Sequence, residues 1–255
     1  MTRARRPPRG TDRPRGGTAL VAGVGADNGL GAALARRFAR EGLHVLVAGR
    51  TQQRLDTVVR ALRDAGGAAD ACLTDVTREA DVTALFDAAD ARGDLELVAY
   101  NVGANAAVPL LDLPAEDFET LWRQNAFGGF LVGREAVRRM LPRARGTVLF
   151  TGATASLRAR PPFTGFAAAK AALRALAQGL AREFGPAGLH VAHVIIDGVI
   201  EGDYAARQFP AFVAAKGADG LLAADDIADA FWMLHRQKTS AWTQELDLRP
   251  FKEPF

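Results

Sequence analysis

Short apolar runs alternate along this chain with longer segments in which apolar residues recur at every fourth position. The first run, residues 18–22, leads through a glycine-rich turn into residues 30–41, where Leu30, Leu34 and Phe38 share this spacing. A short apolar run bounded by turn residues is typical of a buried strand, and the fourfold spacing is typical of one helix face. This part of the chain is therefore predicted to be strand, turn and helix.

The same alternation continues to the C-terminus. Further strands are predicted at residues 44–48, 69–73, 97–100, 147–150, 190–195 and 245–248, and helices at 53–65, 80–91, 114–140 (interrupted near Gly128–Gly129) and 166–184. Strands separated by helices pair in parallel, with crossover helices on both faces of the sheet. The sequence predicts an α/β fold in which residues 18–255 form a single domain, built on one doubly wound Rossmann-type parallel sheet.

The first 17 residues differ in composition from the rest of the chain. They carry six arginines and one aspartate, together with prolines and glycines, and show no hydrophobic period. Such a segment cannot bury a core, so residues 1–17 are predicted to be a disordered basic tail. A nucleic-acid or anionic-surface arm is the alternative. No aromatic residue lies among these arginines and no DNA-reading motif accompanies them, so we expect no nucleic-acid partner.

Composition narrows the class of protein further. About half of the residues are hydrophobic, yet no apolar run is long enough to span a membrane. The run at residues 18–25 is too short and too glycine-rich for a signal peptide. A single cysteine, Cys72, excludes an internal disulfide framework and fits a reducing compartment. We expect a cytoplasmic protein with no membrane partner, and no pattern predicts a metal site.

The turn after the first predicted strand has the composition of a phosphate-binding loop. Its candidate cofactor-binding residues are Gly23, Gly25, Asn28, Gly29, Leu30 and Gly31. Glycines let the backbone approach a pyrophosphate, and the helix that starts near Leu30 presents free N–H groups to it. A tight turn that binds no ligand is the alternative.

This turn resembles the TGxxxGxG motif of the short-chain dehydrogenase/reductase family. Gly25, Gly29 and Gly31 match the glycine spacing, but Val24 then stands in place of the usual threonine. In a second alignment, Ala22 and Gly23 match the family's Thr-Gly and the loop is two residues longer. We favour the longer loop because it keeps the first strand in register.

The end of the second predicted strand bears on the choice of cofactor. It reads Gly49-Arg50, so it lacks the carboxylate that binds the ribose of NAD and offers an arginine for the 2′-phosphate of NADP. An ordinary surface arginine is the alternative. The sequence predicts NADP(H) in preference to NAD(H).

Further matches to the family follow in order along the chain. Asp75-Val76 resembles its adenine-contacting Asp-Val, and Asn101-Val102-Gly103 resembles its Asn-Ala-Gly beside the cofactor. Asn125 matches an asparagine that helps hold a proton-relay water. The resemblance spans roughly residues 18–200.

The family's catalytic Ser…Tyr-x-x-x-Lys pattern is broken in this chain. Lys170 matches the lysine, but Phe166 stands at the tyrosine position and Ala153 at the serine position. Phenylalanine has no ionisable oxygen and cannot act as a general acid or base. A positioned proton donor is typically worth about 10²–10⁴ in rate, so ordinary ketone reduction is predicted to be impaired.

Three other residues are candidates for the missing chemistry. Thr154 offers a hydroxyl if the register shifts by one, and Tyr204 lies in the segment that forms the family's substrate lid. Asp197 replaces the proline of the family's Pro-Gly and precedes Gly198, whose backbone would meet the nicotinamide. Each has a structural alternative: a strand-end cap for Thr154, lid packing for Tyr204, and a turn aspartate for Asp197. His193 points to the same side of its strand as Asp197 and is expected to be a core histidine.

These observations predict an NADP(H)-dependent oxidoreductase with an altered proton-transfer site. Its small-molecule substrate would be an imine, an iminium or a conjugated carbonyl compound, and Asp197 is a candidate for stabilising a cation. The alternatives are a non-redox dehydratase, cyclase or isomerase on the same scaffold, and a catalytically silent nucleotide-binding subunit. By the resemblance, the aromatic C-terminal tail implies a homodimer or homotetramer.

Overall fold

The computed structural model describes residues 16–103, 105–208, 210–217 and 219–253, apart from the Tyr204 side chain. Nearly all of the predicted basic tail therefore lies outside the described residues. No helix in the described ranges is long and apolar enough to cross a membrane.

Seven parallel strands form one sheet in the order β3-β2-β1-β4-β5-β6-β7. The strands are β1 (Thr18–Ala22), β2 (His44–Gly49), β3 (Ala68–Leu73), β4 (Leu95–Tyr100), β5 (Gly146–Thr151), β6 (Leu189–Ile196) and β7 (Glu245–Leu248). The central strands are buried on both faces, which is why they read as continuous apolar runs. The predicted doubly wound α/β sheet is confirmed.

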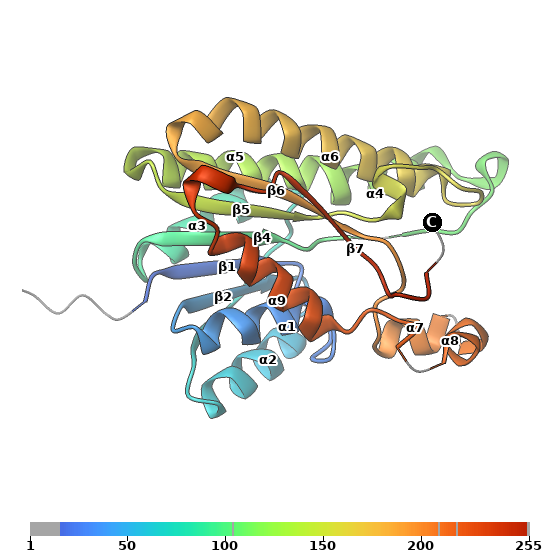
Figure 1. The fold of residues 1–255 in the computed structure, drawn as a ribbon, viewed down its shortest axis with the longest axis horizontal. Helices are drawn as coiled ribbons and strands as arrows, with labels where there is room; N and C mark the ends of the chain where they lie inside the picture. Colours follow the sequence, from blue (N-terminus) through green and yellow to red (C-terminus); the bar gives the residue numbers. More distant parts are fainter. Residues whose placement is uncertain (1–15, 104, 209, 218, 254–255) are drawn as a thin grey trace, which may run out of the picture.

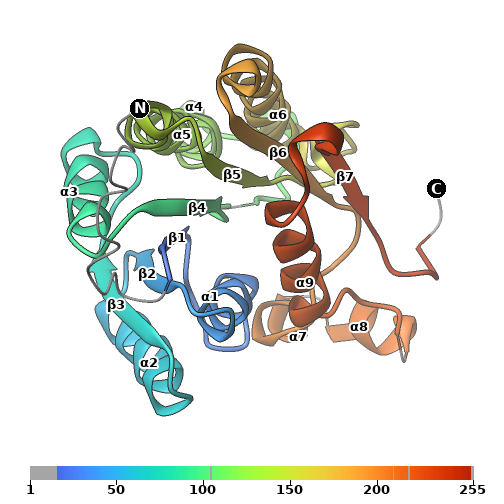
Figure 2. The same cartoon turned by 60° about the vertical axis from the view of Figure 1, so that its left-hand side comes forward.

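Helices cover both faces of this sheet (Figures 1 and 2). The helices are α1 (Leu30–Arg40), α2 (Gln52–Asp64), α3 (Glu79–Asp90), α4 (Ala115–Trp122), α5 (Gly128–Met140), α6 (Thr164–Phe184), α7 (Asp203–Gln208), α8 (Pro210–Lys216) and α9 (Ala224–His235). Helices α1, α2 and α9 bury their apolar sides in one core layer, and α3, α5 and α6 bury theirs in the other. Helix α9 was not predicted, although its buried residues follow helical spacing.

The long helical stretch after β4 is interrupted just before the predicted glycine pair. A π-helical turn at Arg123–Phe127 separates α4 from α5, which starts at Gly128. A Cβ atom on Gly128 would lie 2.6 Å from the Tyr100 hydroxyl, so the glycine permits close packing and does not end the helix. The Tyr100 hydroxyl donates to the carbonyl of Gln124 inside this turn.

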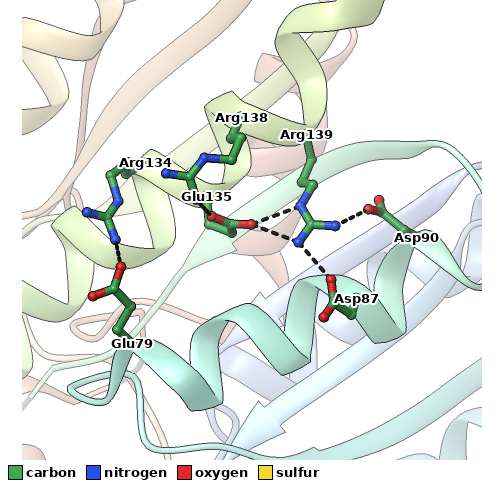
Figure 3. Close-up of polar contacts among 7 residues, drawn as sticks. All are labelled: Glu79, Asp87, Asp90, Arg134, Glu135, Arg138 and Arg139. Atoms are coloured by element: carbon green, nitrogen blue, oxygen red, sulfur yellow. Dashed lines mark hydrogen bonds and ion pairs between the residues drawn. The ribbon is translucent and has the colours of Figure 1, made fainter.

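Ion pairs join α3 to α5 on the outer side of the sheet (Figure 3). The Arg139 guanidinium binds Asp87 at 2.7 Å and Asp90 at 2.5 Å on α3, and Glu135 at 2.8 Å on its own helix. Glu135 is buried and also pairs with Arg138, while Arg134 pairs with Glu79. Hydrogen bonds to these carboxylates raise the pKa of Arg139. The network joins α5, which packs on β4, to α3, which packs on β1, and the carboxyl end of β4 leads into Asn101 and Gly103.

Candidate active site

A cavity of about 270 Å³ lies at the carboxyl ends of β1, β2, β3 and β4. It is lined by Gly23, Val24, Gly25, Gly49, Arg50, Thr51, Arg54, Thr74, Asp75, Val76, Thr77, Asn101, Val102, Gly103 and Gln124. Ligands of open α/β sheets bind at this edge. The cavity brings together seven predicted cofactor residues: Gly23, Gly25, Arg50, Asp75, Val76, Asn101 and Gly103.

The glycine-rich turn is fixed by backbone contacts. Gly23 follows β1 directly with a φ of +96°, and a Cβ atom there would lie 2.6 Å from the backbone of Asn101. A Cβ atom on Gly31 would lie 2.6 Å from the Gly23 carbonyl oxygen. Gly25 has open space around it, and α1 begins at Leu30 after Gly29. Two glycines thus close the turn tightly, while the third leaves room at the cavity.

Asn28 faces the segment that leads into α7. Its side-chain amide donates to a carboxylate oxygen of Asp203, at the start of α7, over 2.7 Å. A Cβ atom on Gly202 would lie 3.2 Å from the Asn28 carbonyl oxygen, so the two loops are in close contact. Asn28 therefore connects the glycine-rich turn to the start of α7.

The wall of the cavity at the end of β2 is basic. Arg50 and Arg54 both line it, and a Cβ atom on Gly49 would lie 2.5 Å from the Val24 carbonyl oxygen, so a side chain has no room there. Sequence reasoning missed Arg54, although it stands four residues after Arg50 and near the start of α2. Two guanidinium groups at this wall suit an anionic group such as a phosphate.

Asp75 is held as a carboxylate at the same wall. Burial opposes its ionisation, but hydrogen bonds from the Thr77 amide at 3.0 Å and hydroxyl at 2.7 Å, with the nearby charge of Arg50, hold its pKa below the usual value. Val76 is buried beside it.

Asn101, Asn125, Gly103 and Lys170 converge at the carboxyl end of β4. The Asn101 side chain donates to the Gly23 carbonyl at 3.1 Å and accepts from the Thr151 hydroxyl at 3.1 Å. The Lys170 ammonium donates to the Thr151 carbonyl at 2.9 Å. From a Cβ position built on Gly103, Lys170 Nζ is 3.5 Å away and Asn125 Oδ1 is 3.7 Å away. These four residues come from three separate segments of the chain.

Phe166 and Lys170 share one face of α6. The Lys170 ammonium lies 5.9 Å from the centre of the Phe166 ring, within the range of a cation–π interaction. Lys170 is buried, and this burial lowers its pKa to about 8. Among the described residues, no carboxylate is within ion-pair distance of Lys170. The ring offers the lysine no oxygen partner.

Asp197 is buried and compensated by its neighbours. Its carboxylate accepts a hydrogen bond from the Thr154 hydroxyl at 2.5 Å and pairs with Arg249 at 3.0 Å and Arg158 at 3.5 Å. The two arginines are far from Asp197 in sequence. This carboxylate therefore ties the end of β5 to the C-terminal segment.

His193 lies beneath the site, between β5 and β7. Its Nδ1 atom donates to Glu245 at 3.2 Å, and Arg174 on α6 holds Glu245 with bonds of 2.6 and 2.8 Å. Burial lowers the pKa of His193 to about 4. The ring packs against Gly152, where a Cβ atom would clash with it. These contacts agree with the predicted core histidine.

Tyr100 and Gly198 both lie in closely packed surroundings. Tyr100 is buried with its hydroxyl bonded to Gln124, and burial raises its pKa. Tyr204 lies in α7, and its side chain is outside the description. A Cβ atom on Gly198 would lie 2.9 Å from Pro250, so the loop after β6 packs closely on the C-terminal segment.

A second cavity, of about 470 Å³, lies between α8, α9 and the end of β7. Among its lining residues are Glu201, Asp226 and Arg249, but none of the predicted catalytic side chains. Within the described ranges, no group of three or more His, Cys, Asp or Glu side chains is suited to a metal ion.

Comparison with known proteins places this arrangement in a family. A model of the short chain dehydrogenase family matches residues 18–218. The chain belongs to this family. It is 29% identical over 237 residues to a gluconate 5-dehydrogenase of Gluconobacter oxydans, covering 91% of this chain and 84% of that protein.

Solved structures agree with this membership of the short-chain dehydrogenases. A short-chain dehydrogenase from Rhodopseudomonas palustris is 38% identical with a TM-score of 0.79, covering 93% of this chain and 100% of that one. A gluconate 5-dehydrogenase from Burkholderia cenocepacia, solved with NADP and tartrate, is 26% identical with a TM-score of 0.79. The match covers 93% of this chain and 95% of that one. The predicted family membership is confirmed.

Proposed function

We propose that this short-chain dehydrogenase is an NADP(H)-dependent oxidoreductase with an altered proton-transfer site. Its substrate class would be imines or conjugated carbonyl compounds. The observation that carries the proposal is a basic, glycine-walled cavity beside a Phe166–Lys170 pair. The cavity fits a dinucleotide phosphate, and the pair lacks a phenol.

The cavity residues fit NADP(H) by their chemistry. The turn Gly23–Gly31 and the start of α1 would take the pyrophosphate, because glycine keeps the backbone accessible and helix N-termini favour anions. Arg50 and Arg54 would hold the 2′-phosphate, and Asp75 with Val76 would flank the adenine. The relative from Burkholderia cenocepacia was solved with NADP, which supports the same preference. When bound, the nicotinamide supplies or accepts the hydride.

On the substrate side, the positions that carry a phenol and a hydroxyl in the family hold Phe166 and Ala153. Phe166 keeps the volume of a tyrosine ring and Ala153 adds only a methyl group, so neither moves a proton. The Thr154 hydroxyl is already donated to Asp197. A carbonyl placed here lacks the donors of the family's serine and tyrosine, so its reduction is slow. An imine nitrogen is more basic than a ketone oxygen and needs less help to take a proton.

The contacts of Asp197 narrow the substrate class. Because Arg158 and Arg249 compensate its charge, this carboxylate has little left for attracting a cation. We therefore favour a neutral imine or a conjugated carbonyl compound over a preformed iminium ion. Asp197 would then order the loop beside the substrate.

Cofactor titration and turnover test the proposal together. NADPH fluorescence should show tighter binding than NADH, and NADPH should be oxidised in the presence of cyclic imines or enones. NADPH binding without oxidation by any compound of either class would contradict an oxidoreductase and favour a silent or non-redox protein. Tighter binding of NADH would contradict the cofactor assignment. A homodimer or homotetramer stays a prediction, which size-exclusion chromatography with light scattering would check.

A further inference from the structure

Reduction of a C=N or C=O bond consumes one hydride and one proton. The hydride is accounted for by the cofactor that the proposed function assigns, but the proton has no source among the family's usual hydroxyls. Ala153 and Phe166 carry no ionisable group, and the Thr154 hydroxyl is bonded to Asp197. A titratable side chain beside the cavity could supply this proton.

The Lys170 ammonium lies next to the cavity wall at Gly103. One of its three N–H bonds is used on the Thr151 carbonyl at 2.9 Å. Its Nζ atom lies 3.5 Å from the Cβ position of Gly103, and Gly103 is an exposed residue of the cavity wall. Gly103 has no side chain of its own to cover this ammonium, and the atoms nearest to its Cβ position, among the described residues, belong to Lys170 and Asn125.

The groups around Lys170 do little to stabilise its charged ammonium form. His193 approaches from β6 and is neutral near pH 7, because burial lowers its pKa to about 4. Arg174, one turn along α6, is paired with Glu245 of β7. Asn125 and Thr151 offer neutral oxygens from the other sides. With burial unopposed by a carboxylate, the pKa of Lys170 falls to about 8, so both its protonation states are accessible near neutral pH.

We propose that Lys170 is the proton donor of this site, in place of the phenol that the chain lacks. This inference rests on the proposed function. As the hydride reaches the substrate carbon and the nicotinamide is oxidised, an Nζ–H bond of Lys170 breaks and an N–H or O–H bond forms on the substrate. Lys170 is left as a neutral amine and regains its proton from water. In the oxidation direction the same amine accepts the proton.

The proposal predicts that the rate of reduction falls as the pH rises. A donor must be protonated, so the rate of reduction is full below pH 8 and falls as the pH rises through about 8. An ordinary lysine would keep its proton to about pH 10.

Titration of the lysine itself needs no substrate. The chain has four lysines, Lys170, Lys216, Lys238 and Lys252, so protein labelled with ¹³C and ¹⁵N lysine gives few side-chain signals. The signal that disappears in Lys170→Arg should titrate near pH 8, below the range of an ordinary lysine. A Lys170 signal that titrates in the ordinary range, near pH 10, would overturn the inference.

Two substitutions of Lys170 distinguish the role of its transferable proton from the role of its positive charge. Arginine keeps a positive charge but does not lose its proton in proteins, whereas glutamine loses both. Both Lys170→Arg and Lys170→Gln should lower kcat for imine reduction by about 10²–10⁴ and remove the fall above pH 8. The exposed Lys238→Arg is the matched control and should behave as wild type. Circular dichroism and NADPH titration of each variant show whether it is folded and binds cofactor.

The outcomes distinguish the two proposals. Turnover by wild type that survives in folded, NADPH-binding Lys170→Gln overturns the role of Lys170 and leaves the oxidoreductase assignment intact. If both substitutions prevent folding, the lysine titration in wild type decides the question. Absence of turnover by wild type overturns both proposals.

Discussion

The two halves of the site differ in which atoms shape them, backbone atoms in one and side chains in the other. The cofactor half, at the ends of β1 to β4, is shaped by backbone: Gly23 faces the backbone of Asn101, and Gly31 faces the Gly23 carbonyl. The substrate half, at the ends of β5 and β6, is shaped by side chains such as Phe166, which has no polar atom. A single substitution can exchange a side chain without moving the backbone. The fold and the cavity can therefore be kept while the chemistry beside them changes.

The halves also differ in electrostatics. Arg50 and Arg54 face the cofactor cavity, where a phosphate can reach them. Asp197 and Glu245, in contrast, are compensated from within the protein by arginines. The first half is arranged to bind a charged ligand, and the second is arranged to keep its own charges satisfied.

The largest expected effect comes from restoring a phenol. Phe166→Tyr keeps the ring and adds a hydroxyl on the face of α6 that carries Lys170. If only the proton chemistry is altered, ketone reduction with NADPH should rise by about 10²–10⁴. Steady-state NADPH oxidation with simple ketones measures this. The matched Phe163→Tyr, just before α6, should give no gain. An unchanged ketone rate in a folded Phe166→Tyr variant would mean that the substrate half is altered beyond its phenol.

A larger residue in the glycine turn should damage the cofactor half. In Gly31→Ala the new Cβ atom would meet the Gly23 carbonyl oxygen at 2.6 Å and the Val24 backbone at 2.9 Å, and neither is a flexible side chain. We expect NADPH affinity to fall at least about tenfold and the free energy of unfolding to drop by about 1–3 kcal/mol. Fluorescence titration measures the NADPH affinity, and urea unfolding measures the free energy of unfolding. Gly25→Ala, which has open space, is the control for stability, and equal unfolding losses in both variants would contradict the packing described here.

Removing the basic wall should weaken one cofactor selectively. A charged hydrogen bond contributes about 1.5–3 kcal/mol, so Arg50→Ala and Arg54→Ala should each raise the Kd for NADPH about tenfold to a hundredfold. The Kd for NADH should stay within about threefold, because NADH has no 2′-phosphate. Exposed Arg60→Ala, further along α2, is the matched control. Equal losses for both cofactors would place these arginines elsewhere on the dinucleotide.

The smallest effect concerns the helices behind the cofactor half. Arg139→Ala removes ion pairs to Asp87, Asp90 and Glu135 and leaves buried Glu135 paired with Arg138 (Figure 3). We expect a loss of about 1–2 kcal/mol in the free energy of unfolding, measured by urea titration. The Kd for NADPH should not change, because none of these residues lines the cavity. A changed Kd would mean that this network shapes the site as well as the fold.

The fold and the cofactor half could be predicted from the sequence, because both depend on local signals. Buried parallel strands appear as apolar runs, and a glycine turn between a strand and a helix has few other uses. Arg54 was missed because its direction depends on where α2 begins. The compensation of Asp197 by Arg158 and Arg249 was also missed. Those pairs join segments that only the tertiary fold brings together, so no spacing rule could reveal them.

We infer an intact cofactor half beside an altered proton chemistry, and one measurement tests this inference most directly. Stopped-flow absorbance would follow oxidation of NADPH by the wild-type protein with a cyclic imine and with the ketone of the same ring. We predict that the imine is reduced faster than the ketone. Faster reduction of the ketone would contradict the account.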